Sequence, residues 1–400
     1  MNVHARRFPL FDSLRAIAVL LVLSYHALGS VIEPGSGAAL RPYAAQLSVG
    51  VSIFFVISGF LLYRPFVHAR VNGGRWISVG AYAWRRFLRI VPAYYVALTV
   101  TTIWLGSSGI FTGSGIARYY LFGQVYSADS VLRGIPVAWS IDVEVVFYAF
   151  LPLFVFLVRR LPGRDPEARL RSEWLAVGGL LAAGVAYNAI VVSKVDLAGY
   201  TPLLKAMPTF TDHFAVGMAL AVASVASERT GRSPPPLRPL DRFPGLAWGV
   251  AVLAFWAVST RIDLHGGAIS AAQLMERRAL YVLIALCVVL PAVFGDPGRG
   301  LVRRLLANRA LLWIGLVSYS VFLYHLAVLR QLERWDFEGF ARIHPYLEVI
   351  DLLLPSLAVA AVSYYLVERP ALRLKRLFGP DEPAAEPAPA SSLSAARPAG

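Results

Sequence analysis

Long apolar segments recur along this chain of 400 residues, and they restrict its fold more than any other feature. About 20 apolar residues suffice for a helix to span the hydrocarbon core of a bilayer. Inside lipid, only helices and closed barrels satisfy their own backbone hydrogen bonds. The sequence therefore predicts an all-α integral membrane protein, a bundle of about ten transmembrane helices. The ten segments are 14–32, 47–63, 90–107, 138–158, 174–193, 210–226, 245–260, 279–295, 311–329 and 349–367.

The distribution of basic residues between these segments predicts the topology. If the N-terminus is inside, the inside segments hold 25 of the 38 Lys and Arg residues and the outside loops hold 11. Each inside segment is then richer in positive charge than its outside neighbours, as the positive-inside rule requires. The net charge of +14 is thus explained by topology, without nucleic acid as a partner. We predict a multi-pass protein of the plasma or inner membrane, with both termini cytoplasmic.

The composition divides the chain into three parts. Residues 1–8 form a predicted cytoplasmic segment, 9–376 a single transmembrane domain, and 377–400 a Pro/Ala-rich tail that we expect to be disordered. The single cysteine, Cys287, excludes an internal disulfide. Since no zinc-type Cys/His spacing is present, we predict no metal site.

Ionisable residues inside the apolar segments indicate a functional site. His26, Glu144 and His325 lie in three different segments, at similar depth in the predicted outer half of the membrane. Such residues are costly in a bilayer and usually face a polar cavity or a partner. We therefore predict that they form a buried acid/base cluster. Arg15 lies about 16 Å from His26 along the same helix, near the inner interface.

Each of these residues also has a structural interpretation. His26 and His325 could be packed histidines bonded to carbonyl groups, and Glu144 could balance the charge of a neighbouring Arg or His. Asp142, closer to the surface, is expected to cap a helix or contact a loop. Asp212 and His213, at the start of the sixth segment, are expected to lie near the interface without a catalytic role.

Three arginines open the third segment on the predicted cytoplasmic side. Arg86 and Arg89 lie three residues apart, and Arg85 and Arg89 four, so they share one helix face. Clustered guanidinium groups suit phosphate binding, although positive-inside charge or contact with anionic lipid is the simpler explanation from these residues alone. In the second segment, Gly59 permits close approach of another helix.

Several motifs in order resemble the acyltransferase 3 family of membrane O-acyltransferases, which modify sugars and other hydroxylated molecules. The resemblance extends from about Pro9 to Leu374. One position departs from it, because many members have a second acid where this chain has Val145. The matching motifs are Asp12-x-x-Arg15 with His26, Phe54–Phe60, Arg86–Pro92, Trp139–Tyr148, Ser318–His325 and Glu368-Arg-Pro370.

The resemblance implies an acyl-CoA donor from the cytoplasm, acetyl-CoA as the commonest, and a hydroxyl acceptor on a glycan or a macrolide-type metabolite. It implies that Arg86 and Arg89 hold the donor phosphates and that Arg15 guides the donor into the bundle. His26 would act as a general base or carry the acyl group. Glu144 would orient His26, and His325 would position the acceptor.

Two other functions fit the same composition. A multi-span transporter or exporter of a small acylated or anionic solute also needs intramembrane charge. No inverted repeat is visible in the sequence, which counts against a transporter. A non-catalytic membrane scaffold would leave His26 and Arg15 unexplained.

Overall fold

The computed structural model describes residues 8, 10–31, 39–74, 76–107, 109–195, 202–262, 264, 269–295, 299–335 and 345–378. Every regular element in these ranges is helical. The predicted N-terminal segment 1–8 and the predicted disordered tail 377–400 fall almost wholly outside them. Which side of the membrane holds the termini stays a prediction.

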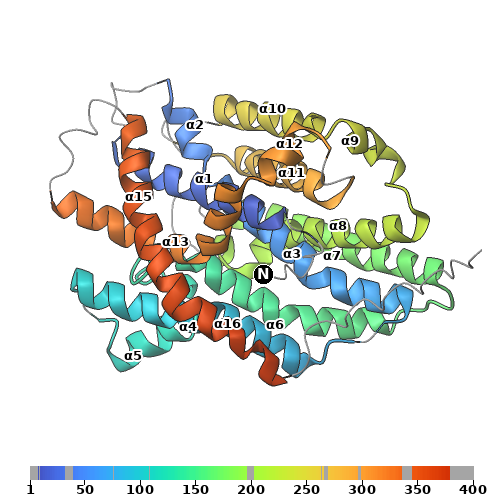
Figure 1. Cartoon of the computed structure of the whole chain (residues 1–400), viewed down its shortest axis with the longest axis horizontal. Helices are drawn as coiled ribbons and strands as arrows, with labels where there is room; N and C mark the ends of the chain where they lie inside the picture. Colours follow the sequence, from blue (N-terminus) through green and yellow to red (C-terminus); the bar gives the residue numbers. More distant parts are fainter. Residues whose placement is uncertain are drawn as a thin grey trace, which may run out of the picture.

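Ten long helices coincide with the ten predicted segments and pack into one bundle (Figure 1). Shorter helices connect them: α2 (Arg41–Gln46), α5 (Gly113–Gly115), α9 (Arg238–Arg242), α12 (Leu301–Leu306) and α16 (Arg369–Arg373). The long helices are α1 (Phe11–Val31), α3 (Val49–Asn72), α4 (Val79–Leu105), α6 (Trp139–Arg159), α7 (Pro166–Lys194), α8 (Thr211–Thr230), α10 (Gly245–Arg261), α11 (Ala271–Val293), α13 (Arg309–Arg334) and α15 (Pro345–Ser363).

Within the described ranges, eight helical spans are long and apolar enough to cross a membrane, and a ninth qualifies if α9 and α10 count as one span bent by 103°. The remaining long helix, α11, does not qualify because every window of 18 residues in it contains Glu276, Arg277 and Arg278. The chain is therefore an all-helical, multi-pass membrane protein.

Contacts between α1 and α3 fix the direction of the helices. Near the start of α1, the Arg64 guanidinium of α3 lies 4.7 Å from the ring centroid of Phe8. Further along α1, the backbone of Ala18 abuts Gly50 at the start of α3. The two helices are thus antiparallel, and we name the two ends of the bundle the Arg15 end and the His26 end after the residues of α1.

Glycines allow the central helices to touch backbone to backbone. A Cβ added at Gly59 of α3 would lie 2.3 Å from the Phe214 carbonyl oxygen of α8, so no side chain fits there. This confirms the close approach expected at Gly59. A Cβ added at Gly315 of α13 would lie 1.7 Å from the carbonyl oxygen of Asp12 in α1. These contacts place α1, α3, α8 and α13 at fixed separations.

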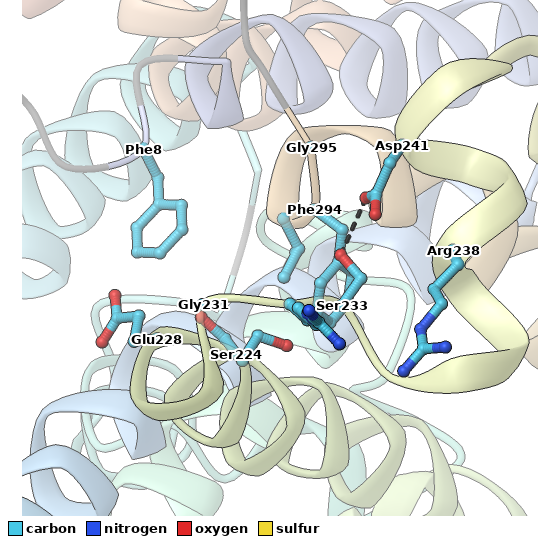
Figure 2. A pocket seen from close by; sticks show the side chains of 12 residues that line it. Phe8, Ser224, Glu228, Gly231, Ser233, Arg238, Asp241, Phe294 and Gly295 are labelled. Atoms are coloured by element: carbon cyan, nitrogen blue, oxygen red, sulfur yellow. Dashed lines mark hydrogen bonds between the residues drawn. The ribbon is translucent and has the colours of Figure 1, made fainter.

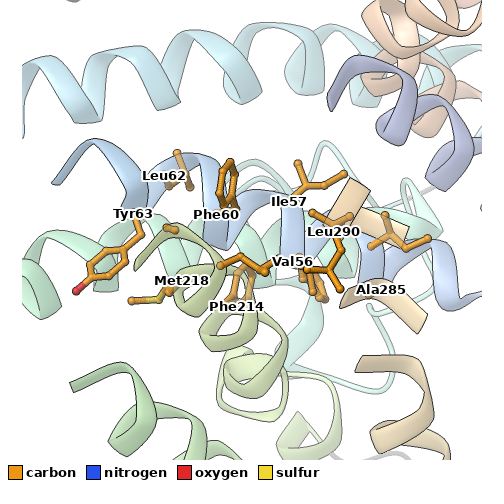
Figure 3. Packing of buried hydrophobic residues seen from close by; sticks show 14 of the residues in the cluster. Val56, Ile57, Phe60, Leu62, Tyr63, Phe214, Met218, Ala285 and Leu290 are labelled. Atoms are coloured by element: carbon orange, nitrogen blue, oxygen red, sulfur yellow. The ribbon is translucent and has the colours of Figure 1, made fainter. Parts of the chain in front are cut away.

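The buried side chains form two apolar clusters. In the larger one, Phe60 and Tyr63 of α3 pack with Phe214 and Met218 of α8 and Leu290 of α11 (Figure 3). The smaller cluster joins the second half of α1 to α4, α13 and α15. Both clusters contribute to the walls of a polar cavity that contains most of the predicted site.

Candidate functional site

A cavity of about 190 Å³ lies between α1, α3, α4, α6 and α13. Four of the predicted site residues, from three helices, line it: Arg15, Arg86, Arg89 and Glu144. Three positive charges thus share one enclosed space with one carboxylate. A cavity of this kind suits an anionic ligand or an anionic part of one.

Ion pairs hold two of these arginines in place. Arg15 donates to Asp12 Oδ1 at 2.8 Å, one turn earlier on α1. Arg89 donates to Glu368 Oε2 at 3.0 Å, and the buried Glu368 also accepts a hydrogen bond from Ser320 at 2.6 Å. The Glu368-Arg-Pro370 motif therefore contributes the anchor of Arg89.

Arg86 is held differently and keeps donor capacity. Its guanidinium lies 5.7 Å from the ring centroid of Tyr148, and that of Arg89 lies 5.6 Å from the ring centroid of Tyr319. The Nε of Arg86 is buried and has no hydrogen-bond partner in the described structure. A buried donor without an acceptor is costly, so this nitrogen is available to an acceptor that enters the cavity.

The two predicted intramembrane histidines meet. His325 Nδ1 lies 2.9 Å from the carbonyl oxygen of Phe322 and 3.1 Å from that of Val321, so this nitrogen carries the proton. His325 Nε2 is then an acceptor, and it lies 3.2 Å from His26 Nδ1. His26 Nδ1 also lies 2.9 Å from the carbonyl oxygen of Val22 and must be protonated to donate to both.

This pattern of hydrogen bonds assigns the tautomer of His26. With the proton on Nδ1, the lone pair of a neutral imidazole stays on Nε2. In the described part of the chain, no hydrogen bond reaches His26 Nε2, and the ring is only half-buried. His26 therefore presents a free basic nitrogen, whereas His325 is completely buried and fully bonded.

The predicted cluster of two histidines with a carboxylate forms only in part. Glu144 accepts a hydrogen bond from Ser58, and the hydrogen bonds of His26 and His325 in the described residues do not include Glu144. Two aromatic rings adjoin the boundary between the cavity and the histidine pair. Phe322 lines the cavity, and its ring centroid lies 6.1 Å from those of His325 and Phe54.

A second histidine site joins α3, α8 and α11. His213 Nε2 lies 3.0 Å from Ser52 Oγ, and His213 Nδ1 lies 2.6 Å from Asp212 Oδ1. Arg278 donates to both Asp212 oxygens, at 2.6 and 2.5 Å. The connectivity is that of a Ser-His-Asp triad, but Ser52 is 5% exposed and lines neither described cavity. The network is a buried structural link, and sequence reasoning missed its cation, Arg278.

Asp142 behaves as expected for a loop contact. Its Oδ2 accepts a hydrogen bond of 3.1 Å from the backbone N–H of Val125, in the long connection before α6. The same connection is tied to α4, because the Tyr94 hydroxyl donates to the Tyr119 carbonyl at 2.8 Å. Asp142 therefore fixes a loop at the His26 end.

A larger cavity of about 730 Å³ lies elsewhere, between the end of α8, α9 and the turn after α11 (Figure 2). Glu228, Arg238 and Asp241 line it, and Ser233 donates to Asp241 at 2.7 Å. None of the predicted site residues reaches this cavity. Among the described residues, no three His, Cys, Asp or Glu side chains are grouped to hold a metal ion.

Comparison with known proteins identifies relatives of the whole bundle. The model of a family described as an acyltransferase domain matches residues 9–367. Nodulation protein 10 of Rhizobium leguminosarum is 25% identical over 395 residues, covering 91% of this chain and 93% of that protein. The peptidoglycan O-acetyltransferase OatA of Listeria monocytogenes is 25% identical over 345 residues, covering 82% of this chain. The match spans 50% of OatA, and no solved structure matches the chain.

Proposed function

This chain belongs to the acyltransferase family whose model it matches, and we propose that it moves an acyl group from cytoplasmic acyl-CoA to a hydroxyl of a glycan. The free Nε2 of His26 carries the proposal, together with a cavity that is lined by three arginines and reaches the ring of Phe322 beside His325. A relative named as a peptidoglycan O-acetyltransferase favours acetyl as the group and a glycan as the acceptor. A macrolide-type hydroxyl is the other acceptor to test.

The donor would bind through its phosphates at the Arg15 end. Guanidinium groups bind phosphate oxygens through paired, charge-assisted hydrogen bonds. The unpartnered Nε of Arg86 supports this role, with Arg89 held beside it by Glu368. At about 190 Å³ the cavity is smaller than the roughly 300–1,000 Å³ of pockets for drug-sized ligands. It would therefore take only part of the donor, with the remainder at its entrance.

The bound donor must span the distance from the arginines, which would hold its phosphates, to His26, about 16 Å along the axis of α1. The narrow pantetheine arm would pass beside Phe54 and Phe322, of which Phe322 contacts His325. These rings exclude water from the thioester. A dry site prevents loss of the acyl group to hydrolysis.

His26 would serve the chemistry through Nε2. As a general base it takes the proton of the acceptor hydroxyl while the oxygen attacks the thioester carbonyl. The C–O bond of the new ester forms, the C–S bond breaks, and the proton passes to the leaving thiolate of CoA. As a nucleophile, Nε2 would instead attack the thioester carbonyl and expel the CoA thiolate, which leaves an acyl-imidazole. The acceptor hydroxyl would then attack this intermediate, the C–N bond would break, and the hydroxyl proton would pass to the released Nε2.

The hydrogen bonds of His26 favour roles for Glu144 and His325 that differ from those expected from the sequence. In this proposal His325, not Glu144, orients His26, because His325 Nε2 accepts the Nδ1 proton. Glu144 lies in the cavity wall with the arginines and would offset their mutual repulsion before the donor binds. The resulting order along the bundle is phosphates at the Arg15 end and acyl transfer at the His26 end.

The test is transfer of label from radiolabelled acetyl-CoA by purified protein, with peptidoglycan fragments, other glycans and a macrolide as acceptors. We expect a labelled glycan with the native protein and none with His26→Ala or His26→Gln. His68→Gln, a histidine of α3 outside both cavities, is the matched control. Transfer retained in either His26 variant would remove His26 from the chemistry.

A further inference from the structure

Two cations at the His26 end have no carboxylate partner among the described residues. Lys205, in the turn before α8, makes one side-chain interaction there, with its Nζ 4.4 Å from the ring centroid of Trp139. Arg277 of α11 binds only neutral groups: Gln46 Oε1 at 3.0 Å, Ser48 Oγ at 3.2 Å and the Tyr281 hydroxyl at 2.9 Å. Two uncompensated charges in half-buried positions favour an anion.

Ring contacts connect the two cations: Lys205 lies over Trp139, Trp139 packs on Phe210, and Phe210 contacts Arg278, the residue after Arg277. Their hydrogen-bond capacity is also incomplete. A guanidinium carries five N–H donors and an ammonium three. The described contacts of Arg277 use Nε and Nη2 and leave Nη1, and no hydrogen bond to Lys205 Nζ is present in the described structure. Several charged donors are therefore available to one ligand.

Aromatic rings and an ion pair surround the two cations. The Trp139 ring packs on Phe210 with centroids 5.6 Å apart, and the guanidinium of Arg278 lies 5.3 Å from the Phe210 centroid. Arg278 is itself fixed by its two hydrogen bonds to Asp212. Because Arg278 is neutralised and its neighbour Arg277 is not, the charge available to a ligand comes from Arg277 and Lys205.

Lys205 and Arg277, which we call the cation cluster, lie away from the proposed donor site. Gln46 and Ser48 immediately precede α3, which runs antiparallel to α1, so Arg277 lies at the end of the bundle that carries His26. Arg86 and Arg89 line the cavity with Arg15. In the predicted topology this end faces outward, where basic residues are scarce. An anion bound there is not the CoA phosphate.

We propose that Lys205 and Arg277 bind an anionic group, a carboxylate or a phosphate, on the glycan acceptor. The inference rests on the proposed function and names its substrate class: an acidic glycan whose hydroxyl is presented to His26 while its charge is held at the end opposite the donor. Trp139 and Phe210 act as positioning residues that keep the ammonium of Lys205 in place.

The test is direct binding, measured by calorimetry on the full chain in nanodiscs of neutral lipid without acyl-CoA. The probes are a muramic-acid disaccharide, its neutral methyl amide, a hexosamine-6-phosphate disaccharide and chitobiose. We expect at least one acidic probe to bind about tenfold or more tightly than its neutral counterpart, since charge-assisted hydrogen bonds are lost with the anion. Equal affinity for acidic and neutral probes would overturn the proposal.

Substitutions test whether Lys205 and Arg277 cause the preference for acidic probes. Lys205→Gln and Arg277→Gln should each weaken the acidic probe about tenfold and leave the neutral one unchanged. Lys205→Arg should retain binding. Arg133→Gln, an exposed cation of the same predicted outer side, is the matched control. An unchanged affinity in both Gln variants contradicts the assignment.

Two further measurements distinguish a folding defect and lipid binding from the proposed acceptor site. Retained binding of CoA-agarose by the Gln variants would show that the bundle is folded, because the donor site lies at the other end. Competition by phosphatidylglycerol nanodiscs with no preference for acidic glycans would assign the cluster to a lipid headgroup and refute an acceptor site. If acidic glycans bind but no label is transferred, the acceptor site stands and the proposed acyl transfer fails.

Discussion

Within the described residues, two histidine sites lie at the same end of the bundle, and they differ in one respect. His213 is bonded at both ring nitrogens, to Asp212 and to Ser52, and Arg278 neutralises the carboxylate. His26 is bonded only at Nδ1 and keeps Nε2 free. The first site resembles a catalytic triad in its connectivity, yet the second has the nitrogen that a reaction requires.

The difference indicates that a free ring nitrogen is a better sign of a catalytic histidine inside the membrane than a neighbouring carboxylate is. A carboxylate beside a histidine raises the basicity of the ring, but this serves catalysis only if the other nitrogen can reach a substrate. At His213 that nitrogen is occupied by a serine that lines neither described cavity. We therefore expect the network around His213 to serve stability and, under the proposed function, the pair of His26 and His325 to serve the chemistry.

The largest effect is expected at His26. His26→Ala should lower kcat for acyl transfer by about 10²–10⁴, the usual contribution of a general acid or base. The thermal unfolding midpoint should stay near that of the native protein, because the ring is only half-buried. Single-turnover kinetics beside a thermal melt measure both. A loss of less than about tenfold with the fold intact would place His26 with the structural histidines.

Asp212→Asn should act on stability instead. It leaves the Arg278 guanidinium without its carboxylate, and breaking a buried ion pair costs about 3–5 kcal/mol. A lower unfolding midpoint is expected, with kcat per folded molecule changed less than about threefold. The double variant Asp212→Asn/Arg278→Gln should recover part of the stability. A loss of kcat without a loss of stability would give this network a catalytic role.

His325→Phe tests the partner that orients His26. The variant removes the Nε2 acceptor, so kcat should fall by up to about tenfold, the worth of one hydrogen bond. The KM for acyl-CoA should not change, because His325 does not line the donor cavity. His325→Gln, whose side-chain oxygen can accept the same proton, should recover part of kcat. Equal activity in all three proteins would mean that His325 only fills space.

The smallest effect is expected for Ser52→Ala. Its hydroxyl bonds His213 inside the bundle, so its removal should cost about 1 kcal/mol of stability or less and leave acyl transfer unchanged. Denaturation and transfer assays on the same preparation measure both quantities. Abolished transfer would point to an acyl-Ser52 intermediate and would remove the distinction between the two histidine sites.

The sequence predicted the helical segments, because they follow from hydropathy, and it predicted that His26 and His325 lie together. It placed Glu144 with these histidines, whereas Glu144 lines the cavity with the arginines. The sequence did not predict which side chains touch, because this depends on how each helix is rotated about its axis. Glu144 lies at a similar predicted depth to His26, yet its hydrogen bond goes to Ser58 of α3.

The start of α11 was missed for a related reason. The apolar segment predicted at 279–295 begins after its charged residues, whereas the helix begins at Ala271 and includes Arg277 and Arg278. Only the folded structure reveals that Asp212 of α8 neutralises Arg278. A hydropathy pattern cannot reveal such an ion pair, because each charged residue taken alone counts against a membrane-spanning helix.

The backbone contacts at Gly59 and Gly315 have a consequence for redesign of this enzyme. No side chain fits at either point, so α3 lies against α8, and α13 against α1, at backbone distance. Both histidines are carried by these helices, so the spacing of the reactive ring would survive extensive changes elsewhere. Libraries that aim at new acceptors can therefore vary the connections before α6 and α8 while this four-helix frame is kept unchanged.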